Sequence, residues 1–158
     1  MNIKFNSNSF DVVTALGVFY HRNVTNDVKG LKEIYRLLKP SGRFFLMDPA
    51  MKCLFGKHDI AFHGIRRYSK EELQSKLEKV GFVVEKISYF NAFLFPFVYL
   101  KRKVEKLSKS EPKSEVQETI NPLINSILEG LFKIEIKGLD NINYPFGINI
   151  FAVARKNN

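Results

Sequence analysis

The segment HDIAFHGIRRY at 58–68 holds the densest group of side chains able to do acid–base chemistry. A neutral imidazole at His58 or His63 could accept a proton from a reacting hydroxyl or amine, because its pKa lies near neutrality. Histidine together with the carboxylate of Asp59 would also suit zinc or iron. These three residues have no regular helical spacing and no obvious fourth ligand, so the sequence predicts no metal site.

Arg66, Arg67 and Tyr68 follow directly and precede a predicted helix start. The guanidinium groups, with the free N–H groups of a helix N-terminus, could bind a carboxylate or phosphate of a substrate. The alternative for the arginines is an ion pair with Asp59 or with the glutamates at 71–72. Tyr68 could orient a substrate hydroxyl, or it could be a partly buried staple for the following helix.

The elements that must position these side chains begin with a strand–helix–strand unit. Residues 10–16 are apolar on both faces, as in a buried parallel strand. Apolar residues at three- and four-residue spacing over 28–38 indicate an amphipathic helix. A Lys-Pro-Ser-Gly turn ends this helix, and residues 43–47 form a second apolar strand. Two strands joined by one helix should be parallel, with a right-handed crossover.

The carboxyl end of the first strand is a second candidate site. Open α/β sheets bind ligands at the carboxyl ends of their parallel strands. Thr14, Ala15 and Leu16 lie at this end, and His21 lies just beyond it. His21 could instead cap the start of the following helix or pack against it.

The rest of the chain alternates helical and strand patterns. Ser69 and Glu72 form a capping box for a helix that runs to about Val80, with Gly81 as its C-cap. Further elements are expected as a strand at 82–89, a helix at 94–107 kinked at Pro96, a helix at 122–132 and a strand at 147–155. We predict one α/β domain over 1–158, with an inserted helical or lid region at 90–137 that contains a linker-like stretch at 108–119.

Several segments occur in an order typical of one enzyme family. They are FDVV at 10–13, His21, LKEIYRLLKPSGRFFLMDP at 31–49, HDIAFHGIRRYSKEEL at 58–73, GF at 81–82 and SYFNAFLFP at 88–96. Together they resemble the C-terminal part of class I S-adenosylmethionine-dependent methyltransferases of the type 11-like group. The resemblance covers roughly 4–104 and 147–155. It departs at 63–64, where His-Gly replaces the Gly-His of the family segment.

The resemblance implies a partial Rossmann-like sheet of three mainly parallel strands and a late antiparallel strand, with helices on its faces. It also implies methyl transfer from S-adenosylmethionine to a small-molecule or lipid-like acceptor, a displacement that depends mainly on proximity and alignment. Under this hypothesis the cofactor would contact Thr14, Ala15, Leu16 and His21; the base would be His63 or His58; and the substrate would contact Asp59, Arg66, Arg67 and Tyr68.

The family's glycine-rich loop, which receives the methionine end of the cofactor, does not occur before Phe10. We therefore expect catalysis to need a missing N-terminal half, and the chain alone to bind S-adenosylmethionine weakly. The alternative is a non-catalytic remnant that binds a ligand or a protein. An apolar first strand without a neighbour could also drive homo-oligomerisation.

The composition indicates a basic globular protein, with a net charge of +9 and a pI of about 9.6. The charge favours anionic partners. The aromatic- and lysine-rich stretch at 90–106 could lie on an anionic membrane surface or form a lid over the sheet. No nucleic-acid recognition motif is found, so nucleic-acid binding is not expected. The single cysteine, Cys53, and the lack of a signal-peptide pattern favour a cytoplasmic location.

Overall fold

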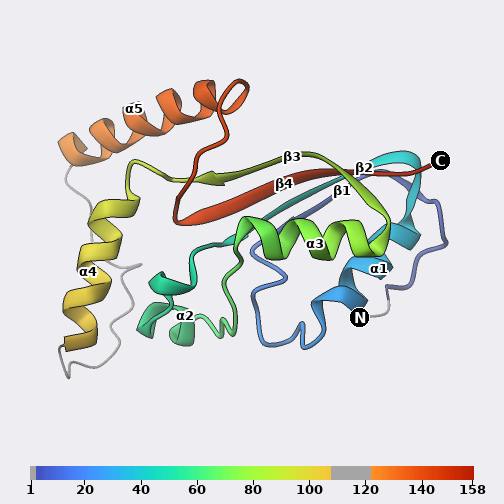
Figure 1. Cartoon of the computed structure of the whole chain (residues 1–158), viewed down its shortest axis with the longest axis horizontal. Helices are drawn as coiled ribbons and strands as arrows, with labels where there is room; N and C mark the ends of the chain where they lie inside the picture. Colours follow the sequence, from blue (N-terminus) through green and yellow to red (C-terminus); the bar gives the residue numbers. More distant parts are fainter. Residues whose placement is uncertain (1–2, 108–121) are drawn as a thin grey trace.

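The computed structural model describes residues 3–107 and 122–158, whose elements are arranged as in Figure 1. In chain order these elements are β1 (Phe10–Leu16), α1 (Asp27–Leu37), β2 (Leu38–Pro49), the 3-10 helix η1 (Lys52–Leu54), α2 (Lys57–Ala61), α3 (Lys70–Val80), β3 (Phe82–Phe90), α4 (Phe95–Leu107), α5 (Pro122–Leu139) and β4 (Asn149–Lys156). The linker-like stretch predicted at 108–119 lies outside the described residues.

The strands form one sheet with the order β1-β2-β4-β3. β1 pairs parallel with β2, whereas β4 pairs antiparallel with both β2 and β3. The last strand therefore lies inside the sheet, and β1 and β3 form its edges. The predicted architecture, three mainly parallel strands and a late antiparallel one, is confirmed.

The core lies between the sheet and the pair of helices α1 and α3, which cover one face of it (Figure 1). Alternate residues of the central strands point to this side and are buried, among them Phe44 of β2 and Ile150 of β4. α1 and α3 contribute buried leucines at helical spacing, such as Leu31 and Leu77. Each large apolar side chain buried in this way contributes about 2 kcal/mol.

The opposite face of β1 and β2 is open. The register pairs Thr14 with Phe45 and Leu16 with Met47, so these four residues share one side of the sheet. Leu16 is 63% exposed and Phe45 is 38% exposed. Figure 1 shows α5 on this second side, near the end of β3 and away from β1. The first two strands thus present an apolar surface that no described residue covers.

The helix signals predicted for α3 agree with the structure in part: Ser69 and Gly81 cap the helix, but the Glu72 carboxylate bonds to Lys76 (2.8 Å) instead of completing the predicted capping box. Asn26 caps α1 by accepting a hydrogen bond from the N–H of Lys29 (2.8 Å). Ser69 caps α3 by accepting one from the N–H of Glu72 (3.2 Å). Gly81 ends α3 in the left-handed conformation, with a φ of 109°.

The predicted turn after α1 is wrong in detail. Lys39 to Gly42 belong to the long strand β2, and the register with β1 shifts at this point. Ser41 has a φ of 62°, so the chain changes direction through an irregularity within the strand. At Gly42 a Cβ atom would lie 2.9 Å from the carbonyl oxygen of Lys39, so the close approach excludes a side chain.

Candidate functional site

The loop after β1 is held by a buried carboxylate at the end of β2. Asp48 is 1% exposed and accepts hydrogen bonds from the N–H groups of Phe19 (3.2 Å) and Tyr20 (3.4 Å). Burial raises the pKa of Asp48 to about 7, against the lowering effect of these N–H donors. The sequence analysis did not select Asp48, although an acidic residue at the carboxyl end of an apolar strand is a usable signal.

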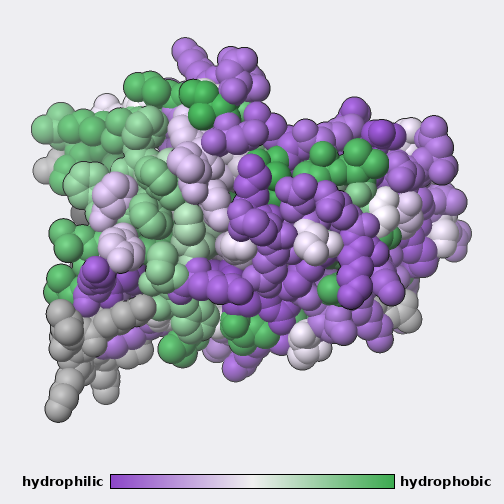
Figure 2. Space-filling view, viewed as in Figure 1, coloured by the Kyte–Doolittle hydropathy of each residue, from purple (hydrophilic) through white to green (hydrophobic). Residues whose placement is uncertain are grey.

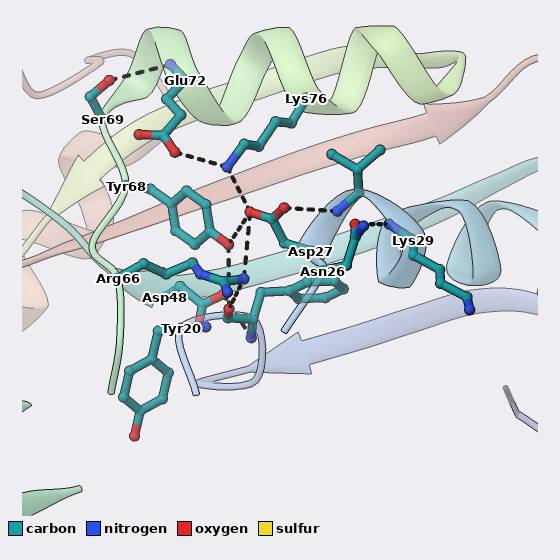
Figure 3. Close-up of polar contacts among 12 residues, drawn as sticks. Tyr20, Asn26, Asp27, Lys29, Asp48, Arg66, Tyr68, Ser69, Glu72 and Lys76 are labelled. Atoms are coloured by element: carbon teal, nitrogen blue, oxygen red, sulfur yellow. Dashed lines mark hydrogen bonds and ion pairs between the residues drawn. The ribbon is translucent and has the colours of Figure 1, made fainter. Parts of the chain in front are cut away.

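A network around Asp27 joins the start of α1 to α3 (Figure 3). One oxygen, Oδ2, accepts hydrogen bonds from the Tyr68 hydroxyl (2.9 Å) and from Lys76 Nζ (2.6 Å). Burial of Asp27 opposes ionisation, but the bonds to Lys76 and Tyr68 outweigh it and lower the pKa of Asp27. Tyr68 is 1% exposed, and its hydroxyl is engaged inside the protein.

Arg66 supports the same loop from the other side. Its Nη1 donates to the carbonyl of Phe19 (3.1 Å) and its Nη2 to that of Thr25 (3.2 Å). Its carboxylate neighbour is Asp27, 3.6 Å away, rather than the acidic residues proposed from the sequence. Arg66 also lines a cavity of about 460 Å³ in which lysines and arginines alternate with Asp27 and Glu72. Four basic and two acidic side chains line this cavity, and ion pairs with Glu72, Asp27 or Asp59 engage all four basic groups.

The segment at 52–68, for which no helix was predicted, contains η1 and α2. Asp59 explains the helix: its Oδ2 accepts from the N–H of Gly56 (2.9 Å) and fixes the first turn. Its Oδ1 accepts from Arg67 Nε (2.8 Å), and Arg67 Nη1 donates to the carbonyl of Ala50 (2.8 Å). Both side chains are buried, so the ion-pair alternative holds for Asp59 and Arg67.

A cavity of about 350 Å³ lies beside this ion pair, where β2 ends and β4 begins. Its position matches the carboxyl edge at which α/β sheets bind ligands. The walls come from Tyr20, Pro49, His58, Asp59, Phe62, Arg67, Val98, Lys101, Arg102, Ile148 and Asn149. The cavity thus combines aromatic and apolar surface with three basic side chains outside the ion pair.

Two buried nitrogen atoms in these walls have no hydrogen-bond partner among the described residues: Nδ1 of His58 and Nε of Arg102. The His58 ring packs against Phe62, with ring centroids 4.6 Å apart. Nη1 of Arg102 donates to Glu105 (2.8 Å), which leaves Nε available. Buried polar atoms are normally paired, so these two indicate a place for a polar ligand or water. The sequence analysis missed Arg102 because it treated the lysines and arginines of α4 as one exposed group.

The structure separates the two histidines proposed as bases. His58 lines the cavity, whereas His63 is exposed and packs against His21, with ring centroids 5.9 Å apart. His63 also has a φ of 57°, and at Gly64 a Cβ atom would lie 2.8 Å from the Tyr20 ring. The His-Gly order at 63–64 is therefore accommodated by a left-handed histidine followed by a glycine that leaves room for Tyr20.

The residues predicted to contact the cofactor lie elsewhere at the sheet edge. Thr14 and Ala15 line an apolar groove of about 310 Å³ along β1, together with Val18 and Phe19. Leu16 ends the strand with its side chain exposed. His21 is engaged locally, because its Nδ1 accepts from the N–H of Asn23 (3.1 Å). These residues offer one apolar wall rather than an enclosed site.

Comparison with known proteins shows which family the chain resembles. Residues 1–46 match a family model described as a methyltransferase domain. The fold matches a structure of Haemonchus contortus phosphoethanolamine N-methyltransferase 2 in complex with S-adenosyl-L-methionine. That match has a TM-score of 0.53 and 19% identity, over 98% of this chain and 35% of that one. The chain is similar to the class I S-adenosylmethionine-dependent methyltransferases in the sequence of residues 1–46 and in its fold. The predicted resemblance is thereby confirmed.

Two curated methyltransferases show sequence similarity. The demethylmenaquinone methyltransferase of Geobacillus sp. (strain WCH70) is 38% identical over 66 residues, which are 42% of this chain and 27% of the relative. The mitochondrial 2-methoxy-6-polyprenyl-1,4-benzoquinol methylase of Xenopus laevis is 30% identical over 116 residues, covering 56% of this chain and 36% of the relative. The chain therefore spans well under half the length of either methyltransferase.

Two further properties bear on the function. Within residues 3–107 and 122–158, no three or more His, Cys, Asp or Glu side chains are grouped so that they could hold a metal ion. In the same part of the chain, every helix is too short or too polar to cross a membrane.

Proposed function

We propose that this chain forms the acceptor side of a methyltransferase that transfers a methyl group from S-adenosylmethionine to a small, lipid-like acceptor. The cavity beside the Asp59–Arg67 pair carries this proposal, because its walls combine aromatic side chains with His58, whose buried Nδ1 has no partner among the described residues. The names of the two curated relatives, which refer to a menaquinone and a polyprenyl benzoquinol, support a ring-bearing acceptor. Tyr20 and Phe62 provide the flat surfaces on which such a ring could pack.

His58 is the base in this proposal. Removing the proton from a hydroxyl group of the acceptor raises the nucleophilicity of the acceptor, and Nδ1 of His58 is the buried, unpaired nitrogen that could take that proton. Positioned general bases contribute about 10²–10⁴-fold to reaction rates. Asp59 and Arg67 then act indirectly, because their ion pair holds α2 and the cavity wall in place.

The cofactor site is only partly formed by the described residues. Thr14 and Leu16, exposed at the carboxyl end of β1, fit one wall of a site for S-adenosylmethionine, which would supply an electrophilic methyl group. None of the strands described here is followed by the glycine-rich turn that receives such cofactors in α/β folds. We propose that a glycine-rich segment outside the described residues, in the same or another polypeptide, completes the site.

Replacing His58 by alanine is expected to lower methyl transfer at least tenfold, because the acceptor loses its base. The rate of methyl transfer is measured with radiolabelled S-adenosylmethionine and a short-chain demethylmenaquinol. The assay uses the protein purified from its native cells. His63→Ala is the matched control and should retain nearly full activity, since His63 lies outside the cavity wall. Equal losses in both variants would contradict the role of His58. Absence of transfer by the unmodified protein to any quinol would contradict the proposed function.

The isolated chain is expected to bind S-adenosylmethionine very weakly, because the described residues supply one wall of the site. Isothermal titration calorimetry should show no binding heat at cofactor concentrations up to roughly 1 mM. A titration with the short-chain quinol alone serves as the comparison, since the acceptor cavity is formed within the described residues. Low-micromolar binding of S-adenosylmethionine would show that the chain already holds a complete cofactor site.

A further inference from the structure

Helix α4 has two faces of different chemistry. Val98 and Arg102 line the acceptor cavity. Phe97, Leu100 and Val104 point outward and are 74%, 64% and 60% exposed. These three residues are three and four positions apart, so they form one apolar stripe along the helix. A stripe of this size on a helix that is already packed on its other side needs a partner.

Lysines flank the stripe on both sides. At 100° per residue, Lys101 and Lys103 lie on opposite sides of the line through Phe97, Leu100 and Val104. The ammonium group of Lys103 lies 5.0 Å from the centroid of the Tyr99 ring. The first turn of α4 has no acidic residue, and Glu105 is bonded to Arg102. The outward half of the described helix is therefore apolar and cationic.

Apolar surface continues from α4 onto α5. Figure 2 shows hydrophobic side chains gathered over the end of the molecule that these two helices form. Leu123, Ile127 and Ile134 of α5 are each more than half exposed and are separated by four and seven residues. The surface is thus wider than one helix, which is unusual for an isolated soluble chain.

We infer that α4 docks on an anionic membrane surface, with its apolar stripe at the boundary between lipid headgroups and acyl chains. Lysines beside such a stripe extend toward anionic headgroups while their carbon stems stay on the apolar side. The chain's net charge of +9 adds a general attraction to such a surface.

A second copy of the chain is a less suitable occupant. In a symmetric contact of two α4 helices, the same surface meets itself, so the flanking lysines of both copies would lie close together. Like charges placed across an interface oppose association. An anionic lipid surface covers the same stripe and attracts the positive charge beside it.

The inference goes beyond the proposed function, because membrane binding requires neither the cofactor nor an acceptor. The two are nevertheless connected by geometry. Lys101, which flanks the stripe, also lines the acceptor cavity together with Val98 and Arg102. Docking through α4 would therefore hold the cavity behind this helix, about one helix diameter of 10 Å from the lipid phase that supplies a lipid-like acceptor.

Co-sedimentation with vesicles tests the docking. The chain should bind vesicles of phosphatidylcholine with phosphatidylglycerol, and should bind pure phosphatidylcholine vesicles less. Leu100→Glu should weaken binding about tenfold or more, because it removes an exposed apolar side chain that would enter the lipid and adds a charge that anionic lipid repels. Lys103→Ala should weaken it about fivefold. Val12→Glu makes the same kind of change on an exposed residue of β1 and should bind like the unmodified chain.

Several results would overturn the inference. These are no binding to anionic vesicles, equal binding by Leu100→Glu and Val12→Glu, and binding that does not depend on anionic lipid. Light scattering without lipid provides another. If the chain does not bind vesicles but forms a dimer that Leu100→Glu abolishes, a second copy of the chain covers the stripe. Circular dichroism establishes that each variant is folded. Lys103→Ala, which changes an exposed side chain, keeps the test decisive if Leu100→Glu does not fold.

Discussion

Asp59→Ala is expected to lower the free energy of unfolding by about 3 kcal/mol or more, because it leaves the buried Arg67 without a counter-charge. Arg67 is 5% exposed and would retain only carbonyl partners, such as that of Ala50 at 2.8 Å. The substitution also removes the acceptor for the N–H of Gly56 at the first turn of α2. Urea unfolding followed by circular dichroism measures the change.

Two variants make this expectation specific. Asp11→Ala removes an exposed ion pair with Lys39 (2.8 Å) and should leave the unfolding curve unchanged. The double variant Asp59→Leu with Arg67→Met replaces both charges by apolar side chains and should regain most of the lost stability, since no charge remains buried alone. If Asp59→Ala is as stable as Asp11→Ala, the ion pair is not buried in solution.

The stability of the protein is expected to decrease as the pH rises from about 5 to about 7.5, and Asp48 is the cause. Its pKa is about 7 in the folded chain and has an ordinary value of 3.8. The folded state therefore holds the Asp48 proton over a range in which the unfolded state has released it. Each unit of this pKa difference corresponds to 1.36 kcal/mol, so the free energy of unfolding falls by about 2.5 kcal/mol between pH 5 and pH 7.5.

Asp48→Asn isolates this effect. The amide oxygen can still accept the N–H of Phe19 but does not titrate, so the midpoint of thermal unfolding should vary much less over the same pH range. The lowered pKa values of Asp27 and Glu72 act in the opposite direction and below this range, so they do not mask it. Parallel curves for the variant and the unmodified chain would show that Asp48 stays ionised in the folded state.

The fold could be predicted from the sequence where the apolar periodicity agrees with the capping and turn residues at the ends of the elements. The apolar run at 10–16 and the Ser69 and Gly81 signals are local, and the structure has the expected elements there. The interior position of β4 came from the family resemblance, because no local pattern states which strands a late segment will pair with. The turn after α1 was misplaced since proline and glycine also suit a strand irregularity.

The candidate site was less predictable, because contacts between residues far apart in the sequence determine which side chains line the cavity and which are buried elsewhere. In the sequence, His58 and His63 are equally suitable as bases. In the structure, His58 lines the acceptor cavity together with residues of α4, whereas His63 packs against His21 in the loop after β1. Arg66 and Arg67 are adjacent, yet one supports that loop while the other neutralises Asp59. Asp48 gains its unusual environment from two N–H groups almost thirty residues away.

The interior position of β4 also governs when the domain can assemble during synthesis. β2 and β3 do not pair with each other, because β4, at residues 149–156, lies between them. A ribosome releases those residues after β1, β2 and β3, so a nascent chain that contains only these three strands holds unpaired strand edges. The sheet closes in one late step, through pairings that span a large part of the sequence and form slowly. For this protein, the interval between translation of β3 and release of β4 is therefore the period of greatest exposure to misassembly.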